Sequence, residues 1–227
     1  MSSLLLVAHG TRHPAGAAVT EAVAAQVRAH TGVRVEACYA DVRRPTPAEA
    51  LAGLPGPVVV VPMFLAAGYH VRVDVPAQIA ATGRADVLLA ETFGPDPVLV
   101  AAAALRLRAA GMRDGDAVVL ATIGSSDPHA QADGATAARR LARELRTPVT
   151  LATTAMGGPR VPDAVARLRA EGARRVAVAS WLLAPGLFHR ALGESGADVV
   201  AGPLSTHEAV AALVVARYTA ALAAAAA

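Results

Sequence analysis

The stretch Leu4-Leu5-Leu6-Val7-Ala8-His9-Gly10-Thr11-Arg12 decides the fold. Five apolar residues are followed directly by a histidine and a glycine, a pattern typical of a strand that is buried on both faces of a parallel sheet and ends in a turn. His9 is then expected at the carboxyl end of the strand, where open α/β sheets bind their ligands. The stretch therefore predicts an α/β fold with a ligand site at His9.

The same pattern returns 114 residues later, over Val118–Pro128. This shift pairs Gly10 with Gly124, and a shift of 118 residues pairs the apolar run Val58–Leu65 with Val176–Leu183. Because several landmarks recur in the same order, we predict two homologous flavodoxin-like units, each a parallel sheet flanked by helices. The expected units are residues 1–112 and residues 113–227, related by a pseudo-twofold axis within a monomer.

The first half also shows where its elements begin and end. Thr46 is placed to cap a short helix that starts with Pro47, and Gly32 stops the helix before it. The predicted elements of this half are the helices 14–30, 47–54, 75–81 and 97–111, the strands 4–8, 33–40, 58–65 and 87–89, and a loop at 66–70.

Composition excludes several classes of function. All 21 basic residues are arginine, which excludes a P-loop lysine and a Schiff-base lysine. With 3% aromatic residues and scattered arginines, nucleic-acid binding is not expected. The single cysteine, Cys38, cannot form an internal disulfide, and neither a signal peptide nor a membrane span is predicted. These features favour a cytoplasmic protein that acts on a small anionic ligand.

The second half serves as an internal control for the histidines of the first. His9 corresponds to Ile123, and His70 corresponds to Phe188, with His189 one place further on. The turn-forming glycines and prolines occur in both halves, whereas these ionisable groups occur mainly in one. We therefore expect one site, built on the N-terminal unit and closed by the C-terminal unit. The alternative is that each histidine merely caps a strand and packs against its neighbours.

His9 and His70 follow strands that are neighbours in a flavodoxin-like sheet, so their rings are expected to converge. Two imidazoles suit Fe²⁺, Co²⁺, Ni²⁺ or Zn²⁺, and two ligands alone give a weak, open site that can release its metal. Asp41 ends the second strand at the same edge and is interpreted either as a catalytic carboxylate or as a turn cap. Arginines around this edge are candidates for gripping substrate carboxylates: Arg12, Arg43, Arg44 and Arg72.

Three stretches carry a resemblance to a known family: 6–12, then Asp41 with Pro45, then 62–71 with Asp74 and Pro76. Together they resemble the class II chelatases of the sirohydrochlorin/cobalt chelatase family, and residues 181–189 are similar to the second-half motif of its long, duplicated members.

The resemblance implies insertion of a divalent metal into sirohydrochlorin, a tetrapyrrole, without ATP and without a permanently bound cofactor. His9 and His70 match the two histidines of the family, as metal ligands, proton acceptors or both, and Asp41 stands where the family usually has glutamate. Ferrous iron for sirohaem is the first metal expected, cobalt for cobalamin the second, and nickel a further possibility. Tyr69 and Met63 are then expected to flank the substrate.

Two other functions are compatible with parts of the pattern. A non-catalytic carrier of metal or tetrapyrrole would use the same histidines. A histidine phosphatase is disfavoured, because its Arg-His-Gly order differs from the His-Gly-Thr-Arg found at residues 9–12.

Overall fold

The apolar stretch at the start of the chain forms β1 (Ser3–Ala8), the second strand of a four-stranded parallel sheet. The computed structural model describes residues 2–11, 13–205 and 207–226. They divide into two compact units: unit 1 is residues 1–94 with 206–227, and unit 2 is residues 95–205.

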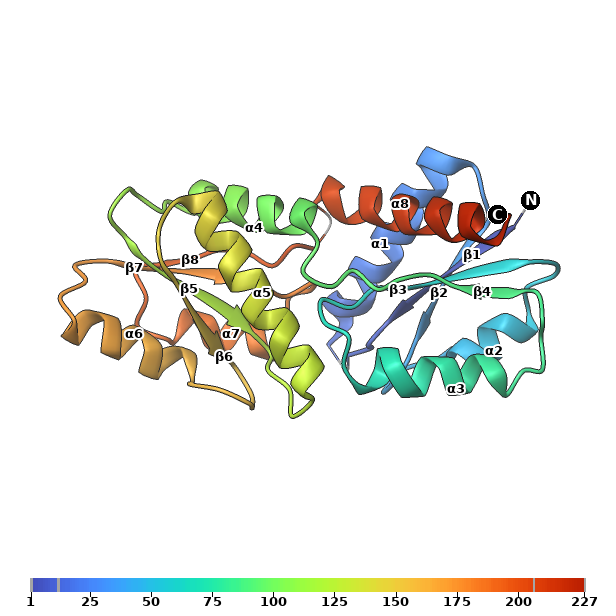
Figure 1. Ribbon diagram of the computed structural model, residues 1–227, viewed down its shortest axis with the longest axis horizontal. Coiled ribbons are helices and arrows are strands. Elements are labelled where there is room, and N and C mark those ends of the chain that lie inside the picture. The colour runs from blue at the N-terminus through green and yellow to red at the C-terminus, as the bar shows by residue number, and fades with distance from the viewer. Residues whose placement is uncertain (1, 12, 206, 227) are drawn as a thin grey trace. The chain divides into compact units, whose positions relative to one another are not determined.

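Unit 1 has strand order β2-β1-β3-β4, so β1 and β3 are neighbours as the flavodoxin-like prediction requires. Helices α1 and α8 lie on one face of this sheet, and α2 and α3 lie on the other (Figure 1). The elements that join β1 in this unit are α1 (Pro14–Thr31), β2 (Val35–Tyr39), α2 (Pro47–Ala52), β3 (Val58–Pro62), one π-helical turn (His70–Asp74), α3 (Val75–Ala80), β4 (Val87–Leu89) and α8 (Glu208–Ala225).

Local signals in the sequence account for the helix ends. The hydroxyl of Thr46 accepts a hydrogen bond from the backbone N–H of Glu49, and the Glu49 carboxylate accepts one from the Thr46 N–H, so α2 begins with a capping box. Gly32 ends α1 with φ 66°, a conformation that glycine adopts without a steric penalty. Both boundaries agree with the prediction.

Unit 2 repeats this architecture with strand order β6-β5-β7-β8, also parallel. Helices α4 and α5 cover one face and α6 and α7 the other (Figure 1). Its elements are α4 (Pro97–Ala109), β5 (Ala117–Thr122), α5 (Pro128–Leu145), β6 (Val149–Thr153), α6 (Val161–Ala170), β7 (Val176–Ser180), α7 (Leu187–Gly193) and β8 (Val199–Val200).

The two units confirm the internal repeat element by element. β1 and β5 are offset by 114 residues, as are α1 and α5, whereas β3 and β7 are offset by 118. Gly10 and Gly124 have φ values of 94° and 91°. Both sequence shifts are therefore reproduced in the backbone.

The compact units do not follow the expected boundary at residues 112 and 113. Helix α4 belongs to unit 2, and the last helix of the chain, α8, belongs to unit 1. The Arg106 guanidinium donates a hydrogen bond to the carbonyl of Leu204 at 3.1 Å, and that of Arg217 donates one to Thr92 at 3.1 Å. Each sheet is thus covered by a helix from the other half of the sequence, and residues 1–112 and 113–227 remain predicted halves of a duplication.

Within the described residues, α8 is the helix that is long and apolar enough to cross a membrane, with a mean hydropathy of 1.5. One side of this helix packs in unit 1. Leu213 and Val214 are buried, and the Tyr218 hydroxyl donates a hydrogen bond to the Ser2 carbonyl at 2.8 Å. The helix packs on α1 and β3, and 33% of its apolar stretch is buried.

Candidate metal-insertion site

The rings of His9 and His70 meet at the carboxyl ends of β1 and β3. The two strands pair in parallel with Val7 opposite Pro62. His9 follows β1 directly, and His70 begins the π-helical turn after β3. The ring centroids are 4.6 Å apart in an edge-on arrangement. The expected convergence of the two imidazoles is therefore confirmed.

Phe64 lies beside both histidines. Its ring centroid is 6.2 Å from that of His9 and 6.3 Å from that of His70. Its carbonyl accepts hydrogen bonds from the Thr92 hydroxyl at 2.9 Å and from the Gly94 N–H at 3.1 Å. The loop that carries Phe64 is thereby tied to the end of the neighbouring strand, and the histidine pair has a fixed apolar side.

The hydrogen-bonding partner of His70 is Asp74. Their Nδ1 and Oδ2 atoms are 2.9 Å apart, and the other carboxylate oxygen accepts a hydrogen bond from Gln78 at 3.0 Å. Burial raises the pKa of Asp74, but the hydrogen bonds from Gln78 and His70 outweigh it, so the pKa lies below its ordinary value. Asp74 is among the residues that carry the family resemblance, but no role is predicted for it from the sequence.

Gly10 lets the loop after β2 come close to His9. The Asp41 N–H donates a hydrogen bond to the His9 carbonyl at 2.9 Å. A Cβ at residue 10 would lie 2.0 Å from the Asp41 carbonyl oxygen, and φ at this position is 94°. Only glycine fits this turn without distortion. The Asp41 carboxylate accepts a hydrogen bond from the N–H of the next residue, Val42, at 2.7 Å, and its catalytic role remains a prediction.

The loop after β2 also forms a shallow depression of about 490 Å³, lined by residues 40–44 and Thr46. The Arg43 guanidinium donates a hydrogen bond to the Thr11 carbonyl at 3.2 Å and lies 5.6 Å from the Tyr39 ring centroid. Arg44 forms an ion pair with Glu49, yet its side chain remains 78% exposed. Two of the predicted carboxylate-binding arginines therefore line one depression.

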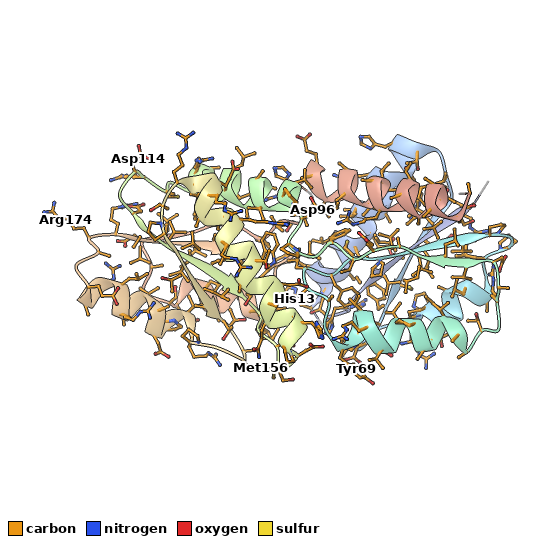
Figure 2. All side chains as sticks on the ribbon, in the orientation of Figure 1. His13, Tyr69, Asp96, Asp114, Met156 and Arg174 are labelled. Atoms are coloured by element: carbon orange, nitrogen blue, oxygen red, sulfur yellow. The ribbon has the colours of Figure 1, made fainter. Side chains whose placement is uncertain are left out.

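The other predicted substrate contacts differ in exposure. Tyr69 is 62% exposed beside His70, at the end of unit 1 where α3 begins (Figure 2). Arg72 is exposed within the π-helical turn. Met63 follows β3 as expected but is only 4% exposed, so its side chain belongs to the packed interior. Arg12 lies outside the described residues.

Unit 2 has apolar side chains at the corresponding positions. Ile123 and Phe188 replace the two histidines, and each is 43% exposed. The neighbouring His189 is hydrogen-bonded to the Ala201 carbonyl at 3.2 Å. The ends of β5 and β7 therefore carry no imidazole pair equivalent to that of unit 1.

In the part of the chain that the structure describes, no group of three or more His, Cys, Asp or Glu side chains is placed to hold a metal ion. Cys38 is buried, which raises the pKa of its thiol and keeps it protonated. The imidazole pair thus has the character of an open site rather than of a closed structural one.

The fold and the site define a duplicated α/β protein with one imidazole pair at adjacent strand ends. SirB from Bacillus subtilis, solved with Fe³⁺, has a similar fold, with a TM-score of 0.83, 20% identity, and coverage of 96% of this chain and 95% of that one. CbiX, described as the terminal enzyme of sirohaem biosynthesis in denitrifying bacteria, superposes with a TM-score of 0.71, 23% identity, and coverage of 96% and 99%.

The CbiX family model matches residues 3–110 and again residues 117–221, so the chain belongs to the CbiX family. The two matched segments correspond to the two halves of the repeat. A sirohydrochlorin cobaltochelatase from Methanosarcina acetivorans is 33% identical over 78 residues, which are 32% of this chain and 60% of that protein. A sirohydrochlorin cobaltochelatase from Methanococcoides burtonii has the same identity and coverage. The chain therefore spans about 60% of the length of these curated relatives.

Proposed function

We propose that this protein is a sirohydrochlorin chelatase, an enzyme that inserts a divalent metal ion into a tetrapyrrole without ATP. The observation that carries the proposal is the 4.6 Å separation of the His9 and His70 rings in unit 1, at positions where unit 2 has Ile123 and Phe188. Membership of the CbiX family and the similarity to two sirohydrochlorin cobaltochelatases support the same reaction. We also propose that it works in the cytoplasm, as its single cysteine suggests.

The chemistry follows from what the macrocycle must lose. Insertion forms bonds from the metal to the ring nitrogens and releases two pyrrolic protons. The site therefore needs a weak ligand that can release the metal and a base that is neutral near pH 7. Neutral imidazole serves both purposes. Two imidazole ligands hold a divalent ion without enclosing it, which leaves its remaining coordination positions for the incoming nitrogens. His9 and His70 are the proposed ligands and proton acceptors, with Asp41 as a further acceptor.

The substrate carries many carboxylates, and arginine binds such groups through two parallel hydrogen bonds. Arg43 and Arg44 line the depression beside His9, and the exposed Tyr69 adjoins His70. We propose that these residues, with Arg72 and Arg12, orient the macrocycle. Met63 is proposed to act on the substrate only through the packing of the loop after β3, because it is buried.

We propose ferrous iron as the physiological metal and cobalt as the second choice. Imidazole binds both ions, and solved structures of Bacillus SirB hold Fe³⁺ in one case and cobalt in another. The test is anaerobic insertion by the purified protein with sirohydrochlorin and Fe²⁺, Co²⁺ or Ni²⁺ in parallel, followed by absorbance against the reaction without protein.

An enzyme accelerates insertion of at least one of these ions over many turnovers, with Fe²⁺ giving the highest kcat/KM. A carrier binds the metal or the tetrapyrrole but leaves the rate at the uncatalysed value, and that outcome would overturn the proposal.

A further inference from the structure

The His70 ring is hydrogen-bonded to the Asp74 carboxylate, which is hydrogen-bonded in turn to Gln78. Asp74 Oδ2 lies 2.9 Å from His70 Nδ1, and Asp74 Oδ1 accepts a hydrogen bond from the Gln78 amide at 3.0 Å. The same amide nitrogen lies 3.5 Å from the Ala40 carbonyl, at the end of β2. Each carboxylate oxygen thus has one directed partner, and the side chain of Asp74 has one orientation.

The backbone places these groups on one side of the helix that follows β3. His70 opens a π-helical turn in which the Val75 N–H donates to the His70 carbonyl, and α3 continues from this turn. His70, Asp74 and Gln78 are spaced by four residues, which aligns side chains along a helix. π-Helical turns are frequent at functional sites, where they redirect a side chain.

The repeat again supplies an internal control. With the shift of 118 residues that pairs β3 with β7, Asp74 corresponds to Leu192 and Gln78 corresponds to Gly196. Leu192 is 1% exposed and belongs to the core of unit 2. The fold therefore forms without the carboxylate and the amide, and these two groups occur only in the unit that has the imidazole pair.

We infer that Asp74, supported by Gln78, is a positioning residue that fixes the tautomer and the orientation of His70, with the proton on Nδ1 and the lone pair on Nε2. An ionised carboxylate only accepts hydrogen bonds, so it selects the imidazole tautomer that donates from Nδ1. Carboxylates that orient metal-binding histidines act in this way and make the remaining nitrogen a better ligand. The inference rests on the proposed function for its consequence in catalysis, but its geometric part stands without it.

The test replaces Asp74 by asparagine, whose amide can either accept from Nδ1 or donate to it. Long-range proton–nitrogen NMR spectra of the metal-free protein report the tautomer of His70, assigned with His70→Gln. We expect the wild type to show the Nδ1–H tautomer and Asp74→Asn to show a substantial population of the Nε2–H tautomer. Asp114→Asn, in the exposed turn before β5, is the matched control and should leave the His70 signals unchanged.

Metal insertion is measured on the same proteins. Asp74→Asn should insert about 10- to 100-fold more slowly than the wild type, the usual effect of losing such a partner, whereas Asp114→Asn should insert at the wild-type rate. Gln78→Leu keeps the carboxylate and should give the same tautomer shift to a smaller extent, which tests the inference even where Asp74→Asn folds poorly.

An unchanged His70 tautomer in Asp74→Asn and Gln78→Leu would overturn the inference, as would insertion at the wild-type rate by Asp74→Asn. A shifted tautomer in a protein whose wild type inserts no metal would support the positioning geometry and refute the proposed function instead.

Discussion

Replacing Gly10 by alanine is expected to disturb the site through the backbone, without removing any chemical group. The φ of 94° lies in the region that costs a residue with a Cβ about 1–2 kcal/mol. The new Cβ would also lie 2.0 Å from the Asp41 carbonyl oxygen, against 3.4 Å for ordinary contact, so the loop after β2 must move by more than about 1 Å. Together these effects predict a loss of about 3 kcal/mol of stability in unit 1.

Gly124→Ala is the matched control, because it has a φ of 91° and places a Cβ 1.8 Å from the Met156 carbonyl oxygen. Urea unfolding followed by circular dichroism should show a similar loss for both variants, and insertion assays below the unfolding transition should separate them. We expect Gly10→Ala to lower kcat, because the loop that moves contacts His9, and Gly124→Ala to retain most of the activity. Equal stability of wild type and Gly10→Ala, or a larger loss of kcat in Gly124→Ala, would refute this reasoning.

Three further predictions follow from other described contacts. Asp116 is 4% exposed and accepts hydrogen bonds from Arg175 at 3.0 Å and from the Arg113 N–H at 2.9 Å. Asp116→Ala should therefore lower the free energy of unfolding by about 2 kcal/mol. A change below about 0.5 kcal/mol in urea unfolding would contradict this. Asp74 has a pKa below its ordinary value of 3.8, so its contribution to stability is complete above that value and is lost as the pH falls through the lower pKa of the folded state. As the pH falls, the free energy of unfolding should therefore decrease more for the wild type than for Asp74→Asn. Parallel plots of this free energy against pH for the two proteins would exclude the effect. Arg44→Gln should raise the KM for sirohydrochlorin about tenfold with kcat unchanged, and an unaltered KM in steady-state assays would remove Arg44 from the proposed substrate contacts.

The strands and their order could be predicted because buried parallel strands are continuous apolar runs that end at glycine or proline. Leu4 to Ala8 forms a strand where expected, the strand expected over 58–65 ends at Pro62, and the two strands pair as neighbours. The internal repeat gave a second, independent indication of the fold. Gly10 and Gly124, which the shift of 114 residues pairs, have nearly the same φ. The convergence of the two imidazoles follows from these two facts.

The turn that carries His70 was not predicted. The sequence predicts a loop over residues 66–70 and a helix from Val75, because Val75-Pro76 is a typical helix start. The structure instead begins a π-helical turn at His70, and its wider hydrogen-bonding pattern has no periodicity that a sequence displays. The pairing of His70 with Asp74 depends on that turn, because residues four apart meet only where the backbone between them is helical.

The membership of the two long alanine-rich helices in the compact units was also not foreseen. Helices α4 and α8 have apolar residues on most sides, so their sequences do not indicate which sheet they cover. Chain order alone suggested a boundary near residue 112, whereas contacts assign α4 to unit 2 and α8 to unit 1.

The joint action of His9 and His70 on the incoming metal is what the proposed function depends on. It is tested most directly by single-turnover insertion of Fe²⁺ into sirohydrochlorin by the double variant His9→Ala/His70→Ala. The double variant His30→Ala/His129→Ala, which removes two exposed helix histidines, is the control. We expect the uncatalysed rate for the first protein and the wild-type rate for the second, with circular dichroism showing that both are folded. Insertion at the wild-type rate without His9 and His70 would contradict this expectation.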